Sequence, residues 1–172
     1  AILTLLFDGP IPPDLCLHSN LTKLILFTNH FSGPITNGLT SCKSLIQVRI
    51  PNNLLIGSIP LGFGSLPNLT RLELQLNKLT GPIPHDLSSS PNLTYLDLSF
   101  NFLDGVPPKN IWNSPNMHNF LACHNNLSGP IPASFGDYPT LTILVLSQNQ
   151  FTGVIPLNMS KCQKLELTGH IP

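Results

Sequence analysis

The residues Asn77-Lys78-Leu79-Thr80-Gly81-Pro82-Ile83-Pro84 form a module that the rest of the chain restates. The asparagine that begins the module recurs with a fixed 24-residue period, at Asn29, Asn53, Asn77, Asn101, Asn125 and Asn149. The glycine recurs in the same rhythm, at Gly9, Gly33, Gly57, Gly81, Gly105, Gly129 and Gly153. Such a register does not arise by chance, so the chain is built from repeats of one supersecondary unit.

The spacing L-x-x-L-x-L-x-x-N-x-L around each asparagine is the signature of a leucine-rich repeat. Within it the x-L-x-L-x segment alternates with period two, which predicts a short strand with its leucines inward. We therefore expect an α/β-type repeat solenoid of 24-residue repeats. It should be a right-handed superhelix with a parallel sheet on its concave face.

The asparagine and the glycine each have a physical reason. Where the coil turns away from the strand, buried backbone groups lack strand partners and must be satisfied. An amide side chain carries both donors and an acceptor, so stacked asparagines can bridge neighbouring coils. The glycine permits a backbone conformation that is costly for residues with a Cβ atom.

Residues 1–172 read as a single solenoid of about seven to eight coils without polar caps, which indicates a piece of something longer. The period fails once. Gly169 follows Gly153 eight positions earlier than the repeat would place it. We infer that eight residues are absent near positions 165–167.

Composition indicates a secreted glycoprotein. The formal net charge is zero, which gives no electrostatic case for a nucleic-acid partner. Charged residues make up 9% of the chain, against roughly 25% in average soluble domains. N-linked glycans would keep such a surface soluble, and N-x-Ser/Thr acceptors occur at Asn20, Asn68, Asn92, Asn126 and Asn158.

The cysteines leave two possibilities open. Cys42 and Cys162 share a column but lie five repeats apart, roughly 24 Å at 4.8 Å per strand, too far for a disulfide. Cys16 and Cys42 lie on adjacent coils and could pair. Otherwise the cysteines are small buried residues.

No enzymatic constellation is present in the sequence. The chain has no G-x-S-x-G, P-loop, H-E-x-x-H or C-x-x-C motif, and its six histidines lack metal-ligand spacing. Cys123-His124 is best interpreted as two ordinary residues in variable columns. We expect no catalytic residues, no metal and no cofactor in this segment.

The variable columns beside the inward leucines are the candidate binding surface, because binding residues sit where the scaffold tolerates change. These columns mix charged, amide and aromatic groups on the expected concave face. The residues selected as a binding site are Phe27, Gln47, Arg49, Arg71, Glu73, Tyr95 and Asp97.

The form Leu79-Thr80-Gly81-Pro82-Ile83-Pro84 resembles the plant-specific class of extracellular leucine-rich repeats. The chain is also similar to plant receptor-like kinases that perceive small secreted CLE-type peptides, in the run Ser41-Cys42-Lys43-Ser44-Leu45 through Asn53 and in Gly57-Ser58-Ile59-Pro60-Leu61-Gly62-Phe63-Gly64. The resemblance implies an ectodomain on the extracellular side of the plasma membrane and a kinase elsewhere in the full-length protein. It also implies a short-ectodomain leucine-rich-repeat co-receptor.

In that family an Arg-x-Arg pair grips the free carboxylate of the peptide. Here the matching positions read Gln47-Val48-Arg49, so only Arg49 carries over. A lone guanidinium still binds a carboxylate bidentately. The other interpretation of Arg49 is a surface charge near Glu73.

Two other functions use repeats of this kind. A soluble plant inhibitor of cell-wall hydrolases, secreted and ending in cysteine-paired caps, is the main competitor. An ice-binding protein needs a flat rank of identical small side chains, whereas these columns are mixed.

Overall fold

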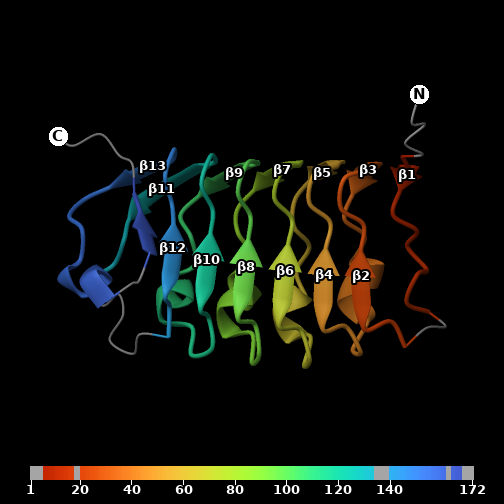
Figure 1. Ribbon diagram of the computed structural model, residues 1–172, viewed down its shortest axis with the longest axis horizontal. Helices are drawn as coiled ribbons and strands as arrows, with labels where there is room; N and C mark the ends of the chain where they lie inside the picture. Colours follow the sequence, from red (N-terminus) through yellow and green to blue (C-terminus); the bar gives the residue numbers. More distant parts are fainter. Residues whose placement is uncertain (1–5, 18–19, 134–139, 162–163, 168–172) are drawn as a thin grey trace.

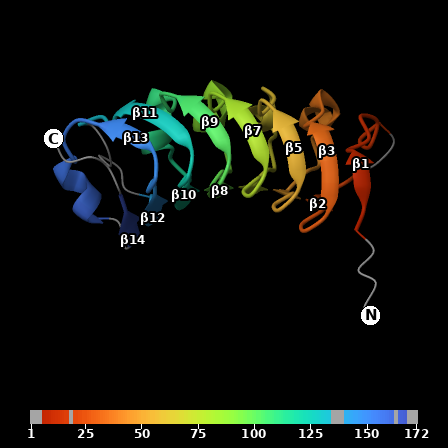
Figure 2. The same ribbon diagram turned by 90° about the horizontal axis from the view of Figure 1, so that it is seen from above.

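The computed structural model describes residues 6–17, 20–133, 140–161 and 164–167. Within these ranges the chain winds into stacked coils, one for each sequence repeat, laid side by side in a row (Figure 1). Figure 2 shows the row gently bowed, with the β2-to-β14 sheet on the inner side of the bow. The leucine-rich-repeat solenoid expected from the sequence is confirmed.

One parallel sheet is made by the x-L-x segments. Its described strands are β2 Lys23–Ile25, β4 Gln47–Arg49, β6 Arg71–Glu73, β8 Tyr95–Asp97, β10 Asn119–Leu121, β12 Ile143–Val145 and β14 Lys164–Glu166. Each strand pairs with the equivalent strand of the next coil, so that Val48 stands opposite Leu72, and Leu72 opposite Leu96. These central residues point into the core and are fully buried.

A second parallel sheet, which the sequence did not predict, runs along the other end of the coils. Its described strands are β1 Asp8–Pro10, β3 His30–Pro34, β5 Leu54–Gly57, β7 Lys78–Gly81, β9 Phe102–Gly105, β11 Asn126–Pro130 and β13 Gln150–Thr152. These strands are the segments that follow each asparagine. Gly81 lies in β7 with φ 76°, in the left-handed region that favours glycine.

Short 3₁₀ helices close the back of the coils. They are η1 Asn37–Ser41, η2 Phe63–Ser65, η3 His85–Ser89, η4 Lys109–Asn113 and η5 Leu157–Lys161. Between these helices and the sheets the inward residues form one continuous apolar core. In one coil, for example, Leu69, Leu72, Leu79 and Leu87 are all fully buried. Each coil therefore buries its apolar face against its neighbours, as a solenoid must.

The last strand is out of step with the others. Paired residues such as Asn119 and Ile143 are 24 positions apart in the sequence. Lys164 stands opposite Ile143, which is a separation of 21 positions, three fewer than in the other pairs. The shift places Leu165 beside Leu144, where Leu165 is 37% exposed. Gly169 lies outside the described residues, and the absence of eight residues near 165–167 stays a prediction.

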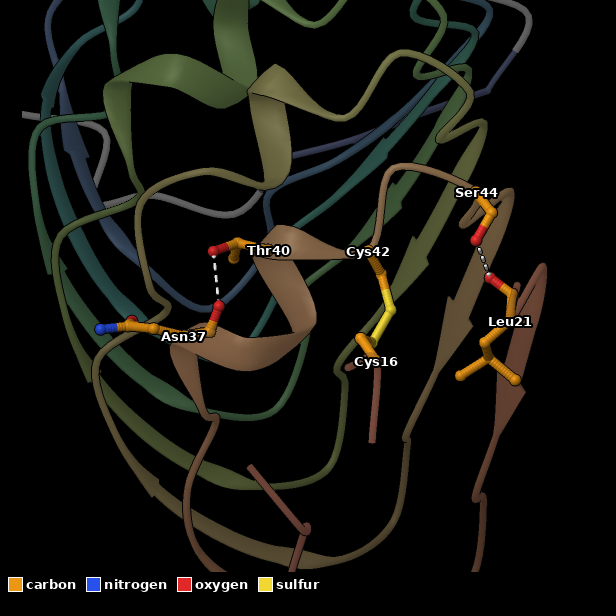
Figure 3. The surroundings of a disulfide bond; sticks show 6 residues. All are labelled: Cys16, Leu21, Asn37, Thr40, Cys42 and Ser44. Carbon is orange, nitrogen blue, oxygen red and sulfur yellow. Dashed lines mark hydrogen bonds between the residues drawn. A yellow bond between two sulfur atoms is a disulfide. The ribbon is translucent and has the colours of Figure 1, made fainter. Parts of the chain in front are cut away.

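Cys16 and Cys42 are joined by a disulfide, which settles one of the two possibilities left open by the sequence. Their Cα atoms are 5.4 Å apart, and the bond ties the first described coil to the next (Figure 3). Ser44 adds a second tie, since its hydroxyl donates to the Leu21 carbonyl oxygen at 2.9 Å. Cys162 lies outside the described residues.

The asparagine ladder joins every coil to its neighbours. The Asn77 amide nitrogen donates to the carbonyl oxygen of Ile50 in the preceding coil, at 2.9 Å, and to that of Leu74 in its own coil, at 3.1 Å. Its Oδ1 accepts the backbone N–H of Leu55 at 3.0 Å. Asn77 is buried, so water does not replace these partners.

A carboxylate caps the turn before η2. Asp86 Oδ2 accepts the backbone N–H groups of Gly62, at 2.7 Å, and of Gly64, at 3.0 Å. The approach is so close that a Cβ atom on Gly64 would lie 2.0 Å from the Asp86 carbonyl oxygen. This contact holds two adjacent coils together at the back of the solenoid.

We predict that Asn77→Ala lowers the free energy of unfolding by about 2–4 kcal/mol, because it leaves a buried N–H and buried carbonyls without partners. Chemical denaturation followed by circular dichroism measures this. Asn29→Ala is the matched control at the half-exposed N-terminal coil, where water can substitute, and should lose less than half as much. Equal losses at the two positions would contradict this account of the ladder.

We predict that Gly64→Ala destabilises the chain by about 3 kcal/mol or more. The added methyl group would clash with backbone atoms of Asp86 and Leu87, which can move only if the adjacent coil shifts. Leu61→Ala, at an exposed position three residues earlier, should change the free energy of unfolding by less than about 0.5 kcal/mol. A thermal melt in which Gly64→Ala behaves like Leu61→Ala would refute the close approach.

Candidate functional site

Six of the seven residues selected from the sequence lie on three neighbouring strands. β4, β6 and β8 bring Gln47 opposite Arg71, and Arg71 opposite Tyr95. Two positions further along the same strands, Arg49 lies opposite Glu73, and Glu73 lies opposite Asp97. These side chains flank the buried central residues and point to the outer side of the sheet. We call Arg49, Arg71, Glu73, Tyr95 and Asp97 the charged cluster.

Glu73 is the centre of the charged cluster. Its Oε2 accepts the Nε–H of Arg49 at 3.1 Å, and its Oε1 contacts Nε of Arg71. Glu73 is only 3% exposed, whereas each arginine side chain is about one-third exposed. Two guanidinium groups therefore neutralise a carboxylate that would be costly to bury alone.

Each arginine binds Glu73 through Nε alone. The terminal nitrogens of Arg49 donate to no residue in the described part of the chain. A guanidinium has five N–H donors in a rigid fork, so Glu73 fixes the orientation of Arg49 and leaves the outer edge of its fork for another acceptor. The structure thus pairs Arg49 with Glu73 through one of its five N–H donors.

Arg71 also covers an aromatic ring. Its guanidinium carbon lies 3.8 Å from the centroid of the Tyr95 ring, which is cation–π geometry. Burial raises the pKa of the Tyr95 hydroxyl, and the nearby Asp97 carboxylate raises it further. Arg71 is therefore held on two sides, by Glu73 and by Tyr95.

Asp97, the other carboxylate of the charged cluster, is nearly buried, with 6% of its surface exposed. Its Oδ1 accepts the backbone N–H of Ser99 at 3.0 Å. Burial raises the pKa of the Asp97 carboxyl above its usual range, Glu73 pushes it the same way, and the bond from Ser99 and the charge of Arg71 partly oppose the rise. The acidic side chains selected from the sequence thus present little surface of their own to a ligand.

Phe27, the seventh residue, lies two positions beyond β2 and is 54% exposed. No described hydrogen bond or ring contact joins it to the charged cluster. It extends the candidate surface toward the N-terminal coil.

A column of left-handed residues at the end of the strands was missed by the sequence analysis. The residue before each ladder asparagine has φ between 52° and 58°, although none is glycine: Thr28, Asn52, Leu76, Phe100, His124 and Gln148. Such a conformation is unusual for side chains of this size. Its sequence signal is weak because six different residue types fill the column.

This column presents aromatic and apolar side chains to solvent. Phe100 is 45% exposed and stacks on His124, with ring centroids 4.3 Å apart. A shallow, open hollow lies beside this stack and not over the charged cluster. It has a volume of about 520 Å³ and is lined by Asn101, Phe102, His124, Asn125, Asn126 and Gln148.

The acceptor asparagines lie at the surface. Asn20, Asn68, Asn92 and Asn126 are exposed. The side chain of Asn158 lies outside what the structure describes. Among the described residues no group of three or more His, Cys, Asp or Glu could hold a metal ion, and no helix is long and apolar enough to cross a membrane.

Known proteins resemble this chain in sequence pattern and in structure. Leucine-rich-repeat families match residues 43–103 and residues 140–162. A chain in the crystal structure of the Arabidopsis receptor kinase HAESA, in complex with the peptide hormone IDA and the co-receptor SERK1, has a TM-score of 0.89 and 39% identity over 96% of this chain. A crystal structure of a TDR receptor has a TM-score of 0.81 and 40% identity over 95% of this chain.

These two relatives are longer than the chain, which spans 28% and 33% of their respective lengths. A chain in the BIR3–SERK2 complex from Arabidopsis thaliana is 32% identical over 74% of this chain, which covers 71% of it, with a TM-score of 0.61. Comparison with curated proteins gives no match.

We predict that Asp97→Asn raises the melting temperature at pH 7, because it removes a buried charge while keeping the acceptor for Ser99. The raised pKa means that the folded chain binds a proton that the unfolded chain releases. Folding is therefore favoured less as the pH rises above the unfolded value near 3.8, and the gain should shrink as the pH falls toward it.

Calorimetric melts at pH 4 and pH 7 test this, with Asp104→Asn as the control at an exposed carboxyl group, where little change is expected at either pH. A lower melting temperature for Asp97→Asn at pH 7 would show that the Asp97 carboxylate is needed by its arginine neighbours, contrary to this prediction.

Proposed function

The chain belongs to the leucine-rich-repeat family, and from this premise we propose that it is an extracellular segment of a plant receptor-like kinase that recognises a small secreted peptide. The observation that carries the proposal is the 39% identity over 96% of the chain to a structure of a receptor kinase bound to a peptide hormone. The sequence resemblance to receptors for CLE-type peptides supports the same function. Among the receptors for CLE-type peptides, the resemblance favours the receptor for tracheary-element differentiation inhibitory factor.

The peptide would lie on the concave face, across the columns that carry the charged cluster. These columns differ from coil to coil while the scaffold residues repeat, as expected for a surface selected for recognition. Phe27 and Gln47 would contribute an apolar and an amide contact beside Arg49. The exposed acceptor asparagines would carry N-linked glycans on other surfaces of the same coils.

Arg49 would bind the C-terminal carboxylate of the peptide. Glu73 holds its Nε–H, which pre-orients the guanidinium and leaves the outer nitrogens for a second, bidentate acceptor. The Glu73 charge reduces the local positive potential. The site would thus favour a carboxylate that arrives in the right geometry over anions in general.

The described strands would hold only part of such a ligand. Seven strands spaced about 4.8 Å apart span roughly 30 Å. An extended peptide of about 12 residues spans about 40 Å. In the longer relatives further coils are present, and we propose that a short-ectodomain co-receptor of the SERK kind binds there with the peptide.

We predict that Arg49→Ala weakens binding of a synthetic CLE-type peptide with a free C-terminus about tenfold or more, the loss of one charge-assisted contact. Amidation of the peptide should weaken binding to the unaltered chain by a similar factor. The two changes together should cost no more than either alone, because they remove the same interaction.

Isothermal titration of the four combinations measures this coupling. Lys78→Ala, which removes one exposed positive charge from the second sheet, is the matched control and should leave affinity within about twofold. If amidation and Arg49→Ala act additively, Arg49 is not the carboxylate anchor. If no peptide of this class binds, the proposed ligand class is wrong.

A further inference from the structure

The hollow beside Phe102 contains a glycosylation acceptor. Asn126 lines the hollow and begins the acceptor sequence Asn126-Leu127-Ser128. It is exposed and lies at the start of β11. An attached sugar would therefore begin at the edge of this shallow hollow.

An exposed aromatic ring stands next to this asparagine. Phe102 occupies the same repeat position one coil earlier, and its strand β9 pairs with β11. The pairing sets Asn126 opposite Asp104, two positions on from Phe102, so Phe102 and Asn126 are diagonal neighbours, and both line the hollow. Phe102 is 62% exposed, one of the most exposed large apolar residues in the described coils. Its ring face is therefore accessible to a group attached at Asn126.

The amide of Asn126 is turned so that its nitrogen is available. Gln150, in the same repeat position one coil later, donates from Nε2 to the Asn126 Oδ1. Gln150 therefore occupies the amide oxygen and not the amide nitrogen. None of the described residues accepts a hydrogen bond from it.

Two other acceptor asparagines differ in this respect. The Asn68 Nδ2 donates to the carbonyl oxygen of Lys43 at 3.1 Å, and the Asn92 Nδ2 donates to that of Pro67 at 2.7 Å. In both cases the nitrogen that would carry a sugar is held against the preceding coil. Neither lies in the hollow.

We propose that the hollow is the seat of the first N-acetylglucosamine of an N-linked glycan on Asn126, with one face of the pyranose ring on the Phe102 ring. The C–H groups of the sugar face would meet the negative face of the aromatic ring. On another wall the His124 imidazole, which stacks on Phe100, offers a hydrogen-bond partner to its polar substituents. The inference rests on the proposed extracellular placement, because only the secretory route supplies this modification.

The modification forms one bond, from Asn126 Nδ2 to C1 of the sugar. The amide nitrogen loses one proton, and the diphosphate of the lipid-linked sugar donor leaves with the bonding electrons. Once the coil has folded, Phe102 would hold the attached sugar flat against the surface and restrict access to the linkage beyond it.

The test uses the chain secreted from plant cells and treated, without denaturation, with an endoglycosidase that cuts between the first two sugars. Site-resolved mass spectrometry follows cleavage at each acceptor. We expect the glycan on Asn126 to be cut more slowly than that on Asn92. Phe102→Ala should speed cleavage at Asn126 roughly fivefold, with no change at Asn92.

Leu54→Ala is the matched control, since Leu54 is an exposed apolar residue in the same repeat column with no acceptor beside it. It should leave cleavage at Asn126 unchanged. Equal cleavage rates at Asn126 and Asn92, in both the unaltered chain and Phe102→Ala, would overturn the proposal that the sugar lies in the hollow. So would a bare Asn126 in a chain that is glycosylated at Asn68 or Asn92. If every acceptor is bare, the proposed extracellular placement fails together with the seat.

Discussion

The structure depends on one repeated interaction, the insertion of an asparagine amide between two coils. Each buried amide donates to a carbonyl of the preceding coil and of its own coil, and accepts an N–H from the segment that follows the preceding asparagine. The interaction satisfies the backbone where the coil leaves one sheet and enters the other. Because every coil makes the same bonds, both sheets keep their register along the row.

This constraint separates scaffold from surface. The inward leucines and the asparagines are committed to the coil, so variation is confined to side chains that point away from the core. On the β2-to-β14 sheet these side chains build a cluster that is largely neutralised internally, with Glu73 between two arginines. In the proposed function, a ligand there would meet an oriented guanidinium and not a bare positive patch, which would favour shape and geometry over net charge.

The same constraint explains what could be predicted from the sequence. The constant repeat length fixes which side chains are inward, which strands are neighbours and which residues share a column, so the alignment of Arg49 with Glu73 and Asp97 followed directly. The near-complete burial of Glu73 and Asp97 could not be predicted in this way. It depends on the way in which the long side chains of their neighbours fold over them. The pairing of Cys16 with Cys42 required a Cα separation that spacing alone leaves open.

The second sheet and the left-handed column were missed for a related reason. The segments after each asparagine are short and contain glycine and proline, which disfavour strands when read alone. They form strands because the ladder presents each one to its neighbour in register. The left-handed residues, from Thr28 to Gln148, share no chemistry, so their conformation is imposed by the turn and not by their own preferences.

The most direct test of the central role of the ladder is hydrogen exchange at the amides that donate to asparagine side chains. Leu55 and Leu79 donate to Oδ1 of Asn77 and of Asn101, both at 3.0 Å. Nuclear magnetic resonance should show both amides among the slowest to exchange, with protection factors of roughly 10³ or more, as for groups exposed only by global unfolding. Exchange at the rate of open turns would contradict the account.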